Sequence, residues 1–314
     1  MSAASPPPLL FGDADVERYL TASQATAVMR AALVAHARGQ AACPPRHRIA
    51  VGGRTLVLTA GTVCDGAFGF RAYETTTDLD QLVAVWRPSG TIQAVVTGTE
   101  LGKARTGAIG AVAVDCLARP DATRLALIGS GPQAWRQVWA IAAIRALSQV
   151  SVFSPAPSHR MALASRVSTQ LKVSCAAAST ARAAVKDADI VVLATSSSQP
   201  VIEAGWIGPG THVSTIGPKT TAAHELPAAL ARDAAVLVTD SRAQALSYSP
   251  AYILDPARLV GLGAILTARA AGRTSGDDIT LFGSVGLSGT EVALAGHLAD
   301  VAAAAVAQAN RRCF

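Results

Sequence analysis

The strongest constraint on the fold is a glycine-rich turn that joins an apolar strand pattern to a helix pattern. Residues 124–129 read RLALIG, residues 132–147 read PQAWRQVWAIAAIRAL, and GSGPQA joins the two. Further apolar runs alternate with helical patterns toward residue 195, which predicts parallel strands with helices on both faces. The sequence therefore indicates an α/β fold with a Rossmann-type parallel sheet.

The glycine-rich turn has the residue types that phosphate binding needs. Gly129 permits a tight turn, Gly131 lets the main chain approach a ligand, and the small Ala134 lets the helix pack on the strand. Main-chain N–H groups and the helix dipole favour phosphates at such a turn. We predict that it holds the pyrophosphate of a dinucleotide through Gly129, Ser130, Gly131, Pro132, Gln133 and Ala134. The alternative is a glycine-rich turn that binds nothing.

The end of the second strand indicates which dinucleotide binds. An Asp or Glu there would hold the ribose 2′-hydroxyl of NAD, but no acid lies between Val150 and Arg160. Ser154, His159 and Arg160 supply a hydroxyl and cationic groups, which suit a 2′-phosphate. The prediction therefore favours NADP over NAD as the cofactor. The alternative is that His159 and Arg160 only begin a solvated helix.

The first third of the chain has a different texture. Residues 46–99 contain short runs rich in Val, Thr and Ile, with a hairpin turn at Pro88-Ser89-Gly90. A helix pattern precedes them, with Thr21 as its expected N-cap. This region predicts an α+β structure with an antiparallel sheet.

Composition and charge exclude several function classes. The net charge of +6 arises from 27 basic and 21 acidic residues that are scattered, so no nucleic-acid-binding tract is expected. No apolar stretch reaches about 18 residues, so we expect no membrane helix, and the N-terminus has no pattern of a secretory signal. The cysteines, including Cys313, form no CxxC pair, which favours reduced thiols, no metal site and a cytoplasmic location.

Several longer segments together resemble the ornithine cyclodeaminase/mu-crystallin family over nearly the whole chain. The resemblance rests on Arg105-Thr106 before an Ala-rich helix, GSGPQA, DIVVLATSSSQPVI, GWIGPGTHVSTIG, HEL, VTDSRAQAL and GRTSGDDITLFGSVGL, in this order. It implies a homodimer in which residues 116–290 form the Rossmann domain. Residues 1–115 with 291–314 would form the α+β domain for substrate binding and dimerisation.

The resemblance also implies a chemistry and further cofactor contacts. That chemistry is hydride transfer between a nicotinamide and the Cα–N bond of an amino or imino acid. The expected cofactor contacts beyond the glycine-rich turn are Thr106, Thr195 and a turn near the nicotinamide that comprises Ser284, Val285 and Gly286.

Three arginines are the expected substrate contacts. By resemblance, Arg46 and Arg105 bind the substrate carboxylate, and Arg48 replaces Arg46 if the register differs. A guanidinium suits a carboxylate because it donates two parallel hydrogen bonds. Arg71 stands where the family usually has a lysine that contacts substrate and transfers protons. Arg71 keeps the charge, but its high pKa makes it a poor acid or base. The alternative for these residues is a structural ion pair.

A lysine replaces a catalytic carboxylate of the family. After THVSTIG, cyclodeaminases have Gly-x-Asp, whereas this chain has Gly217-Pro218-Lys219. Lys219 would repel the side-chain ammonium of ornithine, and near a nicotinamide it would act as a proton donor or acceptor. The alternative is an exposed loop lysine. A further departure is Gly283, where many members carry a polar residue. His224 and Glu225 are expected to begin a helix.

These observations predict an NAD(P)-dependent imine reductase or amino-acid dehydrogenase. Arg71 and Lys219 would be its catalytic residues, and its substrate an amino or imino acid with a carboxylate. One alternative is an ornithine cyclodeaminase, which releases ammonia and recycles NAD within each turnover. Another is a non-catalytic NADP-binding protein, since both the family lysine and the family aspartate are absent.

Overall fold

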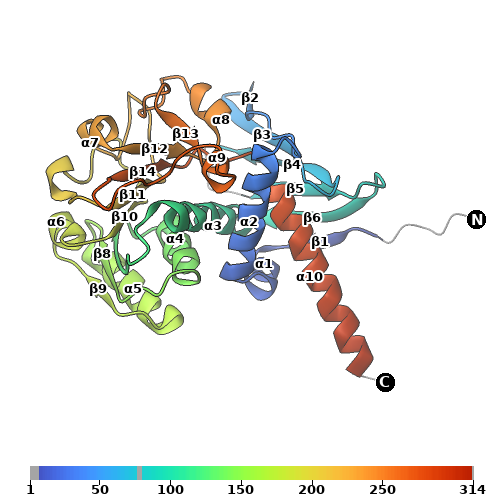
Figure 1. Cartoon of the computed structure of the whole chain (residues 1–314). Coiled ribbons are helices and arrows are strands. Elements are labelled where there is room, and N and C mark those ends of the chain that lie inside the picture. Colours follow the sequence, from blue (N-terminus) through green and yellow to red (C-terminus); the bar gives the residue numbers. More distant parts are fainter. Residues whose placement is uncertain (1–6, 76–79, 313–314) are drawn as a thin grey trace, which may run out of the picture. The chain divides into compact units, whose positions relative to one another are not determined.

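The computed structural model describes residues 7–75 and 80–312 of the chain (Figure 1). The chain divides into two compact units, residues 1–105 with 287–314 and residues 106–286. The two units divide between residues 105 and 106, inside helix α3 (Glu100–Leu117). The domain boundary expected after residue 115 lies in the same helix. Cys313 lies outside the described residues.

The first unit is built on a mixed sheet with the strand order β1-β6-β5-β4-β3-β2. β1 is parallel to β6, and the other neighbours are antiparallel, so the predicted antiparallel α+β region is present. Its strands are β1 (Leu9–Phe11), β2 (His47–Val51), β3 (Arg54–Thr62), β4 (Phe68–Glu74), β5 (Gln81–Trp86) and β6 (Ile92–Gly98). The predicted turn at residues 88–90 joins β5 to β6.

Helices α1 (Asp13–Tyr19), α2 (Ala22–Ala37) and α10 (Thr290–Arg312) belong to the same unit. The predicted N-cap of α2 is confirmed, because the Thr21 side chain accepts a hydrogen bond from the Gln24 amide in a capping box. Helix α10 packs on β4, β5 and β6 and against α2. Buried side chains such as Met29, Leu33 and Leu298 fill this core.

Helix α10 corrects one expectation from the sequence. Within the described residues, its segment Thr290–Ala309 is long and apolar enough to cross a membrane by length and composition. The statement that no such stretch exists was therefore wrong by this criterion. Much of the apolar character comes from alanine, and Val292, Leu294 and Leu298 are buried in the unit. A core helix passes the same test, so composition is weak evidence for a membrane span.

The second unit is built on a parallel sheet with the strand order β13-β12-β14-β11-β10-β7-β8-β9. Its strands are β7 (Arg124–Ile128), β8 (Gln149–Phe153), β9 (Cys175–Ala177), β10 (Ile190–Leu193), β11 (His212–Thr215), β12 (Val236–Thr239), β13 (Leu259–Gly261) and β14 (Thr280–Gly283). Its helices after α3 are α4 (Pro132–Ala142), α5 (Pro157–Arg166), the π-helical η1 (Val167–Leu171), α6 (Ala181–Val185), the 3₁₀ helix η2 (Ala204–Trp206), α7 (Ala228–Asp233), α8 (Arg242–Leu246) and α9 (Leu262–Leu266).

Strand β7 shows why this sheet is covered on both faces. Leu125 and Leu127 belong to one buried cluster, whereas Ala126 and Ile128 belong to another. Such double burial is typical of parallel sheets with helices on both sides. The chain runs outward from β7 through β8 to β9 and then returns to β10 on the other side of β7. In such sheets, ligands bind outside the carboxyl ends of the strands where the order reverses.

Candidate functional site

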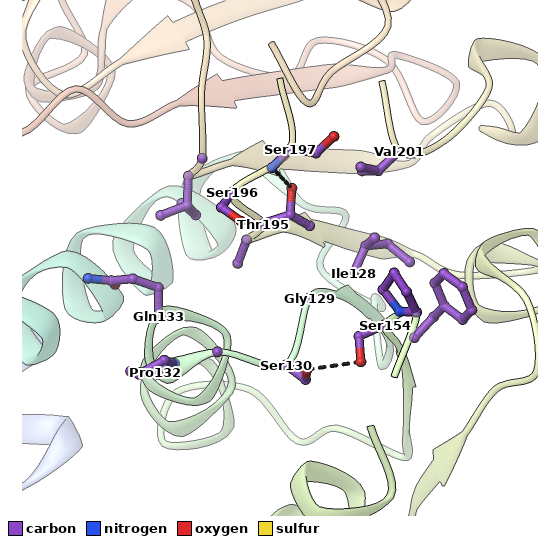
Figure 2. Close-up of a pocket in the computed structure, with 16 residues that line it drawn as sticks. Ile128, Gly129, Ser130, Pro132, Gln133, Ser154, Thr195, Ser196, Ser197 and Val201 are labelled. Carbon is purple, nitrogen blue, oxygen red and sulfur yellow. Dashed lines mark hydrogen bonds between the residues drawn. The ribbon is translucent and has the colours of Figure 1, made fainter. Parts of the chain in front are cut away.

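A cavity of about 720 Å³ opens at the carboxyl ends of β7, β8, β10 and β11 (Figure 2). In the close-up, the glycine-rich turn lies on one side and residues 195–197 on the other. The cavity is lined by Ile128, Gly129, Ser130, Gly131, Pro132, Gln133, Phe153, Ser154, Pro155, Ala194, Thr195, Ser196, Ser197, Val201, Ile216 and Gly217. Most of the predicted pyrophosphate turn and two other predicted cofactor residues, Ser154 and Thr195, therefore line one cavity.

The glycine-rich turn has the shape that a phosphate group requires. Gly129 has a φ of +116°, and a Cβ there would collide with the carbonyl oxygen of Ala194. A Cβ on Gly131 would meet no atom of the chain within 4 Å, so the space before this residue is open. Pro132 begins α4, where the missing N–H costs no helical hydrogen bond, and Ala134 is fully buried. These residues fit a pyrophosphate at the N-terminus of α4.

The end of β8 places a serine in the cavity. Ser154 is buried, and its hydroxyl accepts a hydrogen bond of 2.9 Å from the Ser130 hydroxyl (Figure 2). Arg160 donates from Nη1 to the Ser154 carbonyl at 2.9 Å, and its guanidinium carbon lies 5.6 Å from the Phe153 ring centroid. His159 is exposed on α5, and neither it nor Arg160 is among the cavity-lining residues.

A buried carboxylate fixes two of the cavity walls. Glu225 has no exposed surface, and its Oε2 accepts hydrogen bonds from the Thr195 amide at 2.8 Å and hydroxyl at 2.7 Å. Its Oε1 accepts from the Thr215 hydroxyl at 2.8 Å and from the amides of Ile216 at 3.0 Å and Gly217 at 2.6 Å. The carboxylate therefore joins the segments that follow β10 and β11.

The prediction that His224 and Glu225 begin a helix was wrong. His224 forms an isolated bridge with Lys219, and the next helix, α7, begins only at Ala228. The sequence pattern was misleading because Pro227 and the helix that follows it lie close behind. Hydrogen bonds from Thr195 and from the main-chain amides of Ile216 and Gly217 satisfy the Glu225 carboxylate instead.

Lys219 is buried rather than exposed. Its Nζ donates a hydrogen bond of 2.8 Å to the Ile216 carbonyl and another to the Gly217 carbonyl. Its own carbonyl accepts from the Ile253 amide at 2.9 Å, which ties the lysine segment to the loop before β13. The ammonium thus contacts two residues that line the cavity. Proton transfer by Lys219 stays a prediction.

The turn after β14 is held by a second buried carboxylate. Asp240, directly after β12, accepts from the Ser284 hydroxyl at 2.9 Å and from the amides of Val285 at 2.8 Å and Gly286 at 2.9 Å. Before this turn, the Tyr252 hydroxyl donates to the Gly283 carbonyl at 2.9 Å. A Cβ at position 283 would collide with that hydroxyl, which explains the glycine that departs from the family pattern. Cofactor contact by residues 284–286 stays a prediction.

Thr106 is placed by a hydrogen bond from α4. Its carbonyl accepts from Gln137 Nε2 at 3.1 Å. Gln137 is fully buried, and a Cβ on Gly110 would meet its side chain, so the glycine makes room for this amide. Thr106 does not line the cavity described above, and its cofactor role stays a prediction.

In the first unit, two of the predicted arginines share one carboxylate that the sequence analysis missed. Arg71 on β4 and Arg105 on α3 are 9% and 7% exposed, and Glu291 on α10 is 2% exposed. Glu291 Oε1 accepts from Arg71 Nη1 at 2.7 Å and from Arg105 Nη2. Burial raises the pKa of the Glu291 carboxyl, but Arg105 and Arg71 outweigh this effect and hold it at about 2.

A tyrosine lies between Arg71 and Arg46. The Arg71 guanidinium carbon lies 4.1 Å from the centroid of the Tyr73 ring, and Arg46 Nη1 donates to the Tyr73 hydroxyl at 3.4 Å. Arg71 Nε also donates to Gln81 at 2.9 Å. The three predicted carboxylate ligands thus belong to one set of linked contacts, whereas Arg48 is exposed on β2.

Three acidic residues, Glu225, Asp240 and Glu291, are the principal site residues that sequence reasoning missed or misplaced. A usable signal existed for two of them. Asp240 directly follows a buried apolar strand, and Glu291 is an isolated acid in the apolar segment TEVALAGHL. An acid in such a segment must pair with donors or cations when buried. No spacing rule indicates which donors those are.

Three kinds of comparison relate the chain to known proteins. The model of the ornithine cyclodeaminase/mu-crystallin family matches residues 11–305. A Δ1-pyrroline-2-carboxylate reductase of Paracoccus denitrificans is 32% identical over 230 residues, which cover 69% of this chain and 71% of that protein. Matches to the other curated relatives span about two thirds of their length.

Solved structures resemble the chain over nearly its full length. A probable ornithine cyclodeaminase from Bordetella pertussis has a TM-score of 0.86 at 29% identity, covering 95% of this chain and 98% of that one. A Thermococcus litoralis Δ1-pyrroline-2-carboxylate reductase in complex with NADH and L-proline has a TM-score of 0.83 at 27% identity, covering 93% and 96%. The predicted fold class, a Rossmann-type parallel sheet with a second α+β domain, is therefore confirmed.

Proposed function

The chain belongs to the ornithine cyclodeaminase/mu-crystallin family, and on that premise we propose that it is an NAD(P)H-dependent reductase of α-imino acids. The observation that carries the proposal is the arginine pair around Glu291. Two nearly buried cations share one carboxylate, and the buried Nε of Arg105 has no hydrogen-bond partner among the described residues. A buried cation in excess favours an anionic ligand, and a substrate carboxylate supplies one.

A bound reduced nicotinamide would supply the hydride that reduces an imine carbon next to a carboxylate. The turn at Gly129 to Ala134 would hold its pyrophosphate, with Ser154 and Thr195 along the same cavity. Arg105, with Arg46, would bind and orient the substrate carboxylate. Lys219 is the candidate proton donor, because its ammonium contacts two cavity-lining residues.

A turnover assay tests the reductase proposal. Δ1-Pyrroline-2-carboxylate is the first substrate to try, since reductases of this compound are relatives of the chain. We expect net oxidation of NADPH or NADH with this compound, and loss of that activity when Gly131 is replaced by Val. Ammonia release from ornithine without net cofactor oxidation would instead support a cyclodeaminase. That outcome is disfavoured because Lys219 places a cation where cyclodeaminases have an aspartate.

We also propose a preference for NADPH. A buried serine, and no acid, ends β8, and Arg160 lies against the main chain of residues 154 and 155. A carboxylate at position 154 would repel a 2′-phosphate and accept from a ribose hydroxyl. Ser154→Asp is therefore expected to shift the ratio of NADPH to NADH affinity by at least about tenfold toward NADH. A tighter Kd for NADH than for NADPH in the unchanged protein would contradict the preference.

A homodimer is proposed from the apolar surface of the first unit. β2 is exposed along its whole length, and Ile49 and Val51 on it are 43% and 56% exposed. Phe68, Leu82 and Ile92 on the same sheet are also exposed. Contiguous exposed apolar side chains are typical of protein interfaces. One chain has a mass of 31.9 kDa, and light scattering coupled to gel filtration should give twice this mass. Val51→Glu should reduce the measured mass toward that of one chain.

A further inference from the structure

We propose that Glu291 is a positioning residue, a permanent internal carboxylate ligand of Arg71 and Arg105 that limits this arginine pair to one further carboxylate. The inference rests on the proposed function only where it concerns the substrate. Its structural part concerns the contacts of three side chains within the first unit.

The Glu291 carboxylate joins the two guanidinium groups directly. One oxygen of Glu291, Oε1, accepts hydrogen bonds from both guanidinium groups, and Oε2 accepts from the Thr290 hydroxyl at 3.3 Å. The three residues are 9%, 7% and 2% exposed, for Arg71, Arg105 and Glu291 respectively. Because buried charges are costly without partners, this carboxylate compensates the desolvation of both arginines at once. A guanidinium held in this way has a fixed direction for its remaining donors.

The two arginines are engaged to different degrees. Arg71 donates to Gln81 through Nε and to Glu291 through Nη1, and it stacks on Tyr73. Arg105 donates to Glu291 through Nη2, whereas its Nε has no partner among the described residues. Arg105 is therefore the arginine that presents a donor to a ligand. Arg71 acts through Glu291 as part of the support.

The surrounding chain makes room for this arrangement. A Cβ on Gly102 would lie 2.8 Å from Gln81 Oε1 and 3.4 Å from Arg71 Nη2. Glycine inside a helix costs roughly 1 kcal/mol relative to alanine, and here it avoids a collision with the Arg71–Gln81 pair. Glu291 stands in the first turn of α10, where a negative charge is also favoured by the helix dipole.

The charge count sets the limit on the ligand. Two guanidinium groups and one carboxylate leave the trio with a net charge of +1. One additional carboxylate neutralises the trio, whereas a second would find no counter-charge within the trio. The trio thus suits the single carboxylate next to an imine carbon and disfavours a dianion at the same position.

The first experiment is chemical rescue of the full-length chain, read by thermal unfolding without substrate or cofactor. Glu291→Ala removes the internal carboxylate and leaves a space of its size. We expect the unfolding midpoint to fall by about 5–10 °C and formate to restore at least half of the loss. Asp300→Ala, on the same helix, is the control, since Asp300 is exposed and its carboxylate accepts a hydrogen bond from Gln93 Nε2; it should show neither effect.

An unchanged midpoint in Glu291→Ala, or no response to formate, would overturn the proposal. If the alanine variant does not fold, Glu291→Asp and Glu291→Gln decide the matter. Asp keeps the charge and should retain most of the stability, whereas Gln should not. Equal midpoints for these two variants would show that the carboxylate charge is not what holds the arginines. Since no turnover is measured, a failed reductase assay would leave these results intact.

Sulfate tests the limit on ligand charge. Glu291→Gln raises the net charge of the trio by one, so this dianion should stabilise the variant at about one tenth of the concentration needed for the unchanged protein, a difference that corresponds to 1.4 kcal/mol. Asp300→Ala should behave as the unchanged protein. If the unchanged protein, Glu291→Gln and Asp300→Ala all needed the same sulfate concentration, the proposed limit on ligand charge would be refuted.

Discussion

The cavity beside the glycine-rich turn of the second unit and the arginine cluster of the first unit are both organised by a buried glutamate, but in opposite ways. Within the described part of the chain, Glu225 accepts from neutral groups: hydroxyls of Thr195 and Thr215 and main-chain amides. Glu291 accepts from two guanidinium groups. The first arrangement gives a wall with a fixed shape, and the second gives a fixed charge. Shape suits a large cofactor with many contacts, whereas charge suits a small anion.

The largest expected effect would separate the cavity from the arginine cluster. Gly131→Val places a branched side chain in the space that is open before the glycine-rich turn. Cofactor affinity should fall at least about 100-fold, because two or more phosphate hydrogen bonds of roughly 1.5–3 kcal/mol each would be lost. Fluorescence titration with NADPH measures this Kd without substrate. Unchanged affinity would remove the glycine-rich turn from the proposed site.

The complementary change is Arg105→Met, which keeps much of the side-chain volume but removes the donor group. We expect the KM for the imino acid to rise about 100-fold, since a charge-assisted pair to a carboxylate contributes roughly 2–4 kcal/mol when partly buried. The Kd for NADPH should stay within about twofold, as Arg105 is not among the cavity-lining residues. Steady-state kinetics and the same titration give both numbers. A large change in NADPH affinity would contradict the division of roles.

A third change concerns the neutral wall. Glu225→Gln replaces one acceptor oxygen by an NH₂ group that would face N–H donors. Weakening of the wall should raise the NADPH Kd about tenfold, which corresponds to the net value of one or two hydrogen bonds. The sulfate concentration needed to stabilise the protein against thermal unfolding should not change. Glu225→Asp should recover less than half of the loss, because the shorter side chain cannot span both segments. Wild-type affinity in the Gln variant would show that the carboxylate does not shape the cavity.

The smallest effect is a dependence on pH. The pKa of Glu291 is held at about 2 in the folded chain, below its ordinary value of 4.5. A depressed folded pKa stabilises the protein above the unfolded pKa, and this contribution disappears as pH falls from about 4.5 to 2. Equilibrium unfolding across this range should therefore show a slope that Glu291→Gln removes. An identical slope in both proteins would mean that other groups govern acid unfolding in this range.

A second group titrates over a range that overlaps this window. Burial lowers the pKa of His212 to about 3, with Arg273 and Arg145 adding to the effect. Its contribution is present above the ordinary histidine pKa of 6.5 and is lost between about 6.5 and 3. Because His212 contributes the same slope to both proteins, the difference in slope between the unchanged protein and Glu291→Gln reports the Glu291 carboxyl.

The sequence was sufficient for the parallel sheet and the glycine-rich turn of the second unit because the information for these is local. RLALIG followed by GSGPQA specifies a strand, a turn and a helix within a few residues. The pattern therefore predicted both the fold and most of one wall of the cavity. The opposite wall depends on Glu225, whose partners lie at residues 195 and 215–217. No local pattern reveals such contacts, and a helix that begins at Ala228 made the segment resemble a helix start.

The first unit was harder to predict because its site is assembled from distant segments. Arg71, Arg105 and Glu291 lie on β4, α3 and α10, and the Arg71–Glu291 pair is separated by 220 positions. Only the resemblance indicated the arginines, and nothing in the spacing of charges indicated their carboxylate partner. Hydrophobic periodicity locates strands and helices but does not show which charged side chains meet.

The two carboxylates of the parallel sheet have a consequence for how this protein can change. Glu225 and Asp240 hold their loops largely through main-chain amides, at residues 195, 216 and 217 and at residues 285 and 286. Every residue type except proline provides such an amide. The Ile216 side chain can therefore be exchanged, in evolution or by design, while the loop path is kept. Gly217 cannot, because a Cβ there would collide with the Thr195 carbonyl oxygen, and Gly286 has a φ of +85°. Cofactor preference can thus vary without rebuilding the sheet, provided that the two acids remain.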